Sequence, residues 1–116
     1  MISNPMPGQE DEYNRWYTDD HLKDVVAVAG FASAERFKVV MEATDRLLPG
    51  KYVAIYEIDA DDPKAAFAQL GKDSEAGKLP LSPAFDTKNV SCCILTSMAP
   101  IKRQEQPVDS LTSEEA

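Results

Sequence analysis

Apolar and aromatic positions recur at helical spacing near the start of the chain. The pattern predicts a helix over residues 9–28, with Gly30 as its C-terminal stop. Its first turn is acidic, which complements the positive end of the helix dipole. The residues that share one face follow one another at intervals of four, four, four and three: Tyr13, Tyr17, His21, Val25 and Val28. We expect this face to pack against a sheet.

Three later segments have the composition of strands. Residues 31–41 become strongly apolar toward their end, and residues 51–59 carry β-branched and aromatic side chains throughout. A final strand is predicted over residues 89–101, where Pro100 stops it.

Between the last two predicted strands the pattern changes twice. Asp62-Pro63 predicts the start of a short helix over 63–72, because proline is favoured at the first helical position. Residues 73–88 are a long polar loop, punctuated by glycine and proline. The loop is either a lid over a site or an ordinary flexible connection.

The element order is typical of an α+β architecture, in which an antiparallel sheet carries helices on one face. A complete β-α-β-β-α-β unit would begin with a strand before the first helix, and only residues 1–3 are there to form it. Either this strand is a stub, or the recorded start lies a few residues inside the natural one. We expect one domain over residues 1–101, followed by a tail, 102–116, whose composition predicts disorder.

The charge of the chain limits the classes of partner that we expect it to bind. The formal net charge is -8, and the last thirteen residues contribute four acids and no Lys or Arg. An acidic body without a basic stripe argues against nucleic acid and against anionic membrane surfaces as partners. No apolar run approaches the roughly 18 residues of a membrane span, and the polar start does not predict a signal peptide.

The two cysteines, Cys92 and Cys93, are adjacent in sequence. Neighbours on a strand point to opposite faces, so a disulfide between them would be strained. We interpret both as reduced thiols in a cytoplasmic protein. A chain of 116 residues also buries a limited core, and a homodimer would cover more apolar surface.

The stretch NPMPGQEDEYNRWYTDDHLKDVVAVAGFASAERF, residues 4–37, resembles the opening of the EthD-like proteins in the dimeric α+β barrel superfamily. The shared features are an Asn-Pro-x-Pro-Gly turn, an acidic helix start, an aromatic pair, a helix histidine, and an Arg-Phe pair in the next strand. They fall here on Asn4, Pro5, Pro7, Gly8, Trp16, Tyr17, His21, Gly30, Phe31, Arg36 and Phe37. Residues 54–59 also fit the family's third strand. Lys23 and Ala29 stand where proline is frequent, and the short first strand is a further departure.

The resemblance implies a ferredoxin-like protomer that dimerises sheet against sheet, with a cavity between the first helix and the sheet. Relatives with this architecture include lactone isomerases, polyketide cyclases and cofactor-free monooxygenases, and others have no assigned activity. A fold of this kind therefore does not fix the function.

Two residues of the first helix are candidates for catalysis. His21 titrates near neutral pH, so it can take a proton from a carbon or oxygen centre and return it. Tyr17 lies one helical turn earlier and can donate to a carbonyl or a developing enolate. The plainer alternative is that His21 packs on the sheet and bonds a backbone carbonyl.

Four further residues are candidates for substrate binding. Tyr13 and Trp16 form either core or the wall of a pocket for an aromatic ligand, and Asn14 is placed to orient a ligand. Arg36 either holds a carboxylate or pairs with Glu57 on the next strand, and the pairing is the favoured reading.

Metal and cofactor chemistry find little support in the sequence. Asp19, Asp20 and Asp24 resemble a metal cluster, but their spacing puts them on different sides of a helix, which is typical of a solvated face. A cysteine nucleophile is disfavoured because neither thiol has a basic neighbour. No phosphate-binding glycine loop, haem motif or flavin motif is present. We therefore expect neither a metal nor a cofactor.

Together these features predict a small cofactor-independent enzyme of isomerase, cyclase or lyase type. Its substrate would be a hydrophobic or aromatic carbonyl compound, and His21 would be the general acid or base. The alternatives are a non-catalytic binding or accessory protein that uses the same cavity, and a cofactor-free monooxygenase.

Overall fold

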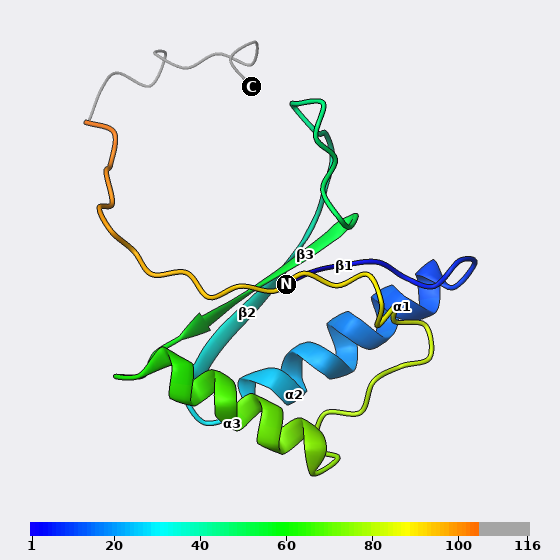
Figure 1. Ribbon diagram of the computed structural model, residues 1–116, viewed down its shortest axis with the longest axis horizontal. Coiled ribbons are helices and arrows are strands. Elements are labelled where there is room, and N and C mark those ends of the chain that lie inside the picture. Colours follow the sequence, from blue (N-terminus) through cyan, green and yellow to red (C-terminus); the bar gives the residue numbers. More distant parts are fainter. Residues whose placement is uncertain (105–116) are drawn as a thin grey trace.

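The computed structural model describes residues 1–104 and shows an α+β chain with an open, three-stranded antiparallel sheet (Figure 1). Its elements are β1 (Ile2–Ser3), α1 (Glu10–Trp16), the π-helical segment η1 (Tyr17–His21), α2 (Leu22–Val26), β2 (Phe31–Lys38), β3 (Tyr52–Ile58) and α3 (Pro63–Glu75). The strand order is β1-β3-β2. The predicted α+β class is confirmed, and at this coarse level the arrangement is consistent with a ferredoxin-like fold.

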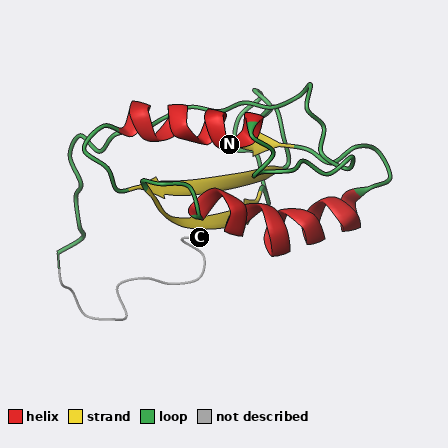
Figure 2. Ribbon diagram, turned by 90° about the horizontal axis from the view of Figure 1, so that it is seen from below, coloured by secondary structure: helices red, strands yellow, loops and turns green. Residues whose placement is uncertain are grey.

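The sheet buries one of its faces against helices. The segments α1, η1 and α2 form one N-terminal helix, which lies on the same side of the sheet as α3 (Figure 1). Figure 2, seen from below, shows these two helices as separate rods, with the strands visible in the gap. Along β3, Tyr52 and Ala54 are buried on the helix side. Ile55, the next residue, points to the other face and is 58 % exposed. On β2, Phe37 lies opposite Val53 and is 42 % exposed. An apolar strip therefore remains open on the face away from the helices.

The predicted helix over residues 9–28 is one continuous rod from Glu10 to Val26 with a π-helical turn in the middle. Side chains four residues apart in an α-helix drift by about 40° per step, because the turn holds 3.6 residues. A π turn is wider and counters that drift, so Tyr13, Tyr17 and His21 all remain buried. The sequence pattern predicts the shared face but not the π turn that maintains it.

One predicted strand is too long, and another is not formed. The strand over 31–41 ends at Lys38, because its partner β3 begins at Tyr52, directly opposite. The strand over 89–101 is not formed: only Ser91 makes an isolated bridge, to Ile2. The physical reason is the length of β1, since a two-residue strand gives residues beyond Ser91 nothing to pair with.

The stub predicted over residues 1–3 is present and paired. Ile2 lies opposite Val53, and the terminal ammonium of Met1 donates to the Ala54 carbonyl at 3.1 Å. Ser91 bridges to Ile2 at the edge of β1 that does not pair with β3. The chain around Ser91 therefore lies beside β1. This is where the fourth strand of a ferredoxin-like sheet lies.

Helix α3, the second helix predicted from the sequence, begins where expected. It is three residues longer than predicted, Pro63–Glu75 instead of 63–72. The Asp62 carboxylate caps it by accepting from the backbone N–H groups of Lys64 and Ala65, at 3.1 and 3.2 Å. The loop that follows is anchored rather than loose, since Leu79, Ala84 and Phe85 are buried in the core.

Beyond Ser91 the described chain is exposed and without regular structure, and most of the predicted tail, residues 105–116, lies outside the described residues. Within residues 1–104 none of the helices has the length and apolar character needed to cross a membrane.

Candidate functional site

His21 lies in a cage of aromatic rings at the end of the π-helical turn. It is 8 % exposed, stacks on Trp16 with ring centroids 4.7 Å apart, and meets the Tyr17 ring edge-on at 5.0 Å. Its Nδ1 atom is buried and has no hydrogen-bond partner among residues 1–104. Burial lowers the pKa of His21 below its ordinary value of 6.5, and the nearby Asp24 carboxylate opposes this only in part. The imidazole is therefore neutral at neutral pH.

Tyr17 is the hydroxyl-bearing ring that contacts His21 in this cage. Its hydroxyl oxygen accepts a hydrogen bond from the Tyr56 hydroxyl at 3.2 Å, which leaves the Tyr17 proton available to another acceptor. Burial raises the pKa of Tyr17 far above its ordinary value and that of Tyr56 to about 12. Both phenols therefore stay protonated and can act as hydrogen-bond donors.

Arg36 closes the cluster from β2 and contacts rings rather than acids. Its guanidinium carbon is 4.6 Å from the centroid of the Tyr17 ring, 5.4 Å from that of Tyr13 and 5.3 Å from that of Tyr52. Its Nη1 also donates to the Thr18 hydroxyl at 2.9 Å. The positive charge is thus held over the rings that surround the catalytic candidates.

The favoured pairing of Arg36 with Glu57 is wrong. Arg36 lies opposite Ala54 on the helix side of the sheet, whereas Glu57 lies opposite Ser33 on the other side. Side chains three residues apart along a strand point to opposite faces, so Glu57 is out of reach. The Arg36 Nη2 donates instead to Asn14 Oδ1 at 2.9 Å.

Tyr13 and Asn14 serve as the frame of the site. Tyr13 is fully buried and shares a hydrogen bond of 2.5 Å with the Ser3 hydroxyl. The Asn14 side chain donates to the Tyr52 hydroxyl at 3.2 Å, and Tyr52 donates in turn to a Glu10 carboxylate oxygen at 2.5 Å. Because their polar atoms are engaged by protein partners, these residues are better suited to fixing the rings than to contacting a ligand.

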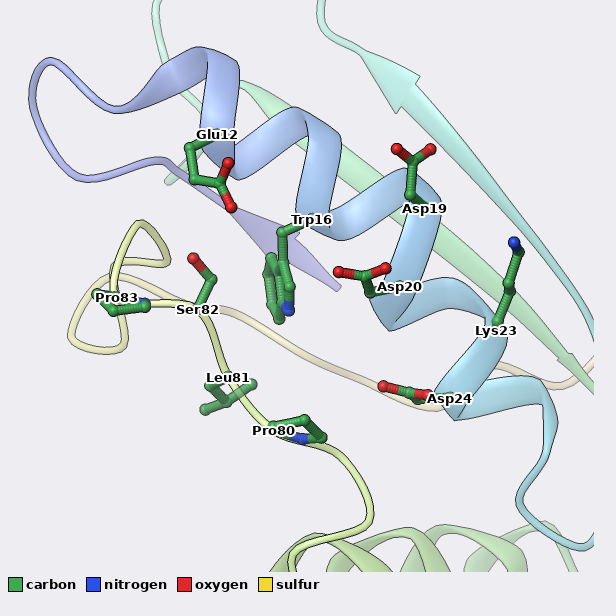
Figure 3. Close-up of a pocket in the computed structure, with 10 residues that line it drawn as sticks. All are labelled: Glu12, Trp16, Asp19, Asp20, Lys23, Asp24, Pro80, Leu81, Ser82 and Pro83. Atoms are coloured by element: carbon green, nitrogen blue, oxygen red, sulfur yellow. The ribbon is translucent and has the colours of Figure 1, made fainter.

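Two open cavities flank the site rather than containing it. One, of about 660 Å³, lies between the N-terminal helix and residues 80–83, and Trp16 lines it (Figure 3). The other, of about 620 Å³, lies between Met6 and residues 81–89. Neither is lined by His21 or Tyr17, so neither is the cavity between helix and sheet that the family resemblance implies.

The structure thus brings the predicted residues together in one cluster, and it adds members that the sequence pattern did not single out. Tyr52 and Tyr56 alternate along β3 on the helix side, a signal present in the sequence once that face is known. Phe85 packs against Tyr13, Trp16 and Tyr17 from within a polar loop, where no periodic pattern marks it.

The three aspartates of the N-terminal helix diverge in space. Figure 3 shows Asp20 and Asp24 directed toward the cavity, and Asp19 directed away from it. Among residues 1–104 there is no set of three or more His, Cys, Asp or Glu side chains arranged to hold a metal ion. Cys92 and Cys93 are both free thiols on the surface.

Comparison with known proteins adds no relative. No protein-family model matches the chain, and neither a curated protein nor a solved structure shows significant similarity to it. The function must therefore be argued from the geometry of the cluster itself.

Proposed function

We propose that the chain is a small cofactor-independent enzyme that acts on a hydrophobic or aromatic carbonyl compound through His21. One observation carries the proposal: a neutral, buried imidazole has an unpartnered Nδ1 in the same cage as the hydroxyl of Tyr17. A buried nitrogen without a protein partner costs free energy unless a water, a ligand or a reacting group satisfies it, and a catalytic role is one explanation for keeping it. The likeness to EthD-like proteins over residues 4–37 favours the same reading.

The chemistry needs only proton transfer. Because His21 and Tyr17 are buried and line neither open cavity, a substrate would reach them through an opening of the aromatic cage. The neutral Nδ1 of His21 removes a proton from the carbon next to a substrate carbonyl, and the Tyr17 hydroxyl donates to the carbonyl oxygen as negative charge develops there. The imidazolium then delivers the proton to another position of the enolate, which completes an isomerisation without a net change in electrons. Return to the same carbon regenerates the substrate and is observed as proton exchange. Cyclase or lyase chemistry would start from the same enolate.

The remaining candidates would support these two groups. Arg36, held by Asn14 and lying over the ring of Tyr17, favours negative charge on substrate oxygen nearby. Tyr13 and Trp16 would supply the apolar walls that exclude water, since both are almost fully buried.

The same proposal includes a homodimer. The open face of the sheet exposes Phe37 and Ile55 beside Val53, and sheet-to-sheet packing of two copies would cover them, as in a dimeric α+β barrel. Contiguous exposed apolar patches mark interaction surfaces.

A proton-exchange assay tests the chemistry without knowledge of the substrate. The protein is incubated in D₂O with a panel of aryl ketones, lactones and 1,3-dicarbonyl compounds, and incorporation of deuterium at carbon is followed by NMR. We expect catalysed exchange with at least one class, lost in His21→Gln and reduced in Tyr17→Phe. Asp61→Asn, an exposed site before α3, is the control for handling and folding. Exchange that persists unchanged in folded His21→Gln would refute the role of His21.

A second candidate function is binding without turnover, and the Trp16 cavity favours it. That cavity is open to solvent yet is not lined by His21. A chain that binds ligands but promotes no exchange with any compound of the panel would support a binding or accessory role.

A further inference from the structure

A second group of polar side chains surrounds the cavity of about 660 Å³ between the N-terminal helix and residues 80–83 (Figure 3). We propose that this cavity binds a small organic cation that has an apolar body and carries a hydrogen-bond acceptor. The site goes beyond the acid–base function proposed above and does not depend on it, because His21 and Tyr17 do not line it.

The indole of Trp16 provides the first indication of a ligand. The side chain is only 5 % exposed, and its N–H has no hydrogen-bond acceptor among the described residues. Figure 3 shows the indole nitrogen at the ring edge that faces the cavity, between Asp20 and Leu81. The N–H itself is not buried, so it is accessible from the cavity and free to donate to a ligand there. A ligand oxygen placed in the cavity would satisfy it.

The carboxylates around Trp16 provide the second indication. Glu12, Asp20 and Asp24 project toward the cavity, in contrast to Asp19 (Figure 3). Arg15 pairs with Glu12 at 2.8 Å and with Asp20 at 3.3 Å, and so offsets part of their charge.

Asp24 is the carboxylate that remains for a ligand. It is half-buried and makes no hydrogen bond or ion pair with another residue in the range 1–104. Lys23, its nearest cationic neighbour in sequence, is directed away from the residues 80–83 in Figure 3. An ammonium or guanidinium group would form a charge-assisted hydrogen bond with Asp24.

The opposite wall determines the body of the ligand. Pro80, Leu81 and Pro83 present apolar, conformationally restricted surface across from the carboxylates. The loop that carries them is fixed by the buried Leu79 and Ala84 on either side. A cavity with one apolar wall and one acidic wall, of a volume usual for small-molecule sites, suits an aromatic or aliphatic amine.

Three nearly isosteric probes separate the requirements for charge and for the acceptor. They are 2-amino-1-phenylethanol, which has both features, 2-phenylethylamine, which lacks the acceptor, and 1-phenyl-1,2-ethanediol, which lacks the charge. Trp16 is the only tryptophan of the chain, so its single indole N–H resonance reports on the cavity directly. We expect saturable shifts of that resonance with affinities in the order given.

Charge-matched variants locate the cation. Asp24→Asn should weaken binding of 2-amino-1-phenylethanol roughly tenfold or more, as expected for loss of a charge-assisted hydrogen bond. Asp61→Asn removes the same charge outside the cavity and should leave the affinity unchanged. Trp16→Phe, read by calorimetry, should remove the preference for the amino alcohol over 2-phenylethylamine. The proposal is overturned if no probe binds at millimolar concentration, if the diol binds as well as the amines, or if Asp24→Asn and Asp61→Asn behave alike.

Discussion

His21 is the only histidine of the chain, so its titration can be followed without ambiguity. Burial lowers its pKa in the folded state, and the unfolded chain therefore binds the proton more readily. Above the ordinary value of 6.5 the residue has no effect on the pH dependence of stability. As the pH falls below 6.5 toward the folded-state pKa, the free energy of unfolding decreases. We expect the single imidazole NMR signal to titrate with a midpoint below 6.5.

The variant His21→Gln tests the linkage. Its free energy of unfolding, measured in urea between about pH 8 and pH 5.5, should lose the part of the acid dependence that His21 contributes. The free energy of unfolding of the parent should therefore fall by more than that of the variant as the pH falls. An acid dependence that is identical in the two proteins would mean that His21 does not change its pKa on folding.

At the scale of elements, two glycines, one in a turn and one within a helix, are expected to respond in opposite ways to the same substitution. Gly30 has a φ of +93° at the turn into β2, and an added Cβ would lie 2.9 Å from the Ala66 Cβ on α3. Gly30→Ala should therefore reduce the free energy of unfolding by roughly 1–3 kcal/mol. Gly71 lies within α3, and an added Cβ would meet no atom within 4 Å, so Gly71→Ala should stabilise the chain by about 0.5–1 kcal/mol.

Denaturant titration of both variants measures the difference directly. Equal effects in the two variants would contradict the close contact between Gly30 and α3. An unchanged m-value in each would show that the substitution changed stability and not the surface exposed on unfolding.

Sequence periodicity predicts these elements well where one face is buried and the pairing is local. The helix over 9–28, the strand over 51–59 and the proline start of α3 follow from apolar spacing and capping residues alone. The pattern does not predict the π turn at Tyr17–His21, because the shared face looks the same with or without it. Nor does it place Arg36, whose side is determined by strand register rather than by its own neighbours.

At the scale of the whole molecule, residues 89–101 show a limit of prediction from local sequence. Their composition favours a strand, yet strand formation needs a partner, and β1 offers two residues. Phe85, which completes the aromatic cage, reaches it only through the path of the loop after α3. Long-range pairing of this kind cannot be read from local pattern.

The open face of the sheet gives a prediction for the assembled protein. We expect the chain to be a dimer at micromolar concentration in light scattering, because Phe37 and Ile55 are exposed on a face without helices. Ile55→Glu should yield a folded monomer, since a charge in a sheet-to-sheet interface would be desolvated without a partner. Val40→Glu, at an exposed position beyond the end of β2, should leave the dimer intact. A parent protein that is monomeric under these conditions would contradict the proposed barrel.

Because Trp16 stacks on His21, the fluorescence of Trp16 should report the protonation state of His21. The chain has a single indole fluorophore, and its ring lies 4.7 Å from the only imidazole. A protonated imidazole quenches the emission of an adjacent indole far more strongly than a neutral one does. The brightness of the protein should consequently dim as acid reaches His21, without any added dye. Protonation of one buried nitrogen, otherwise followed by NMR, thereby becomes visible in a cuvette and in a stopped-flow instrument on the millisecond scale.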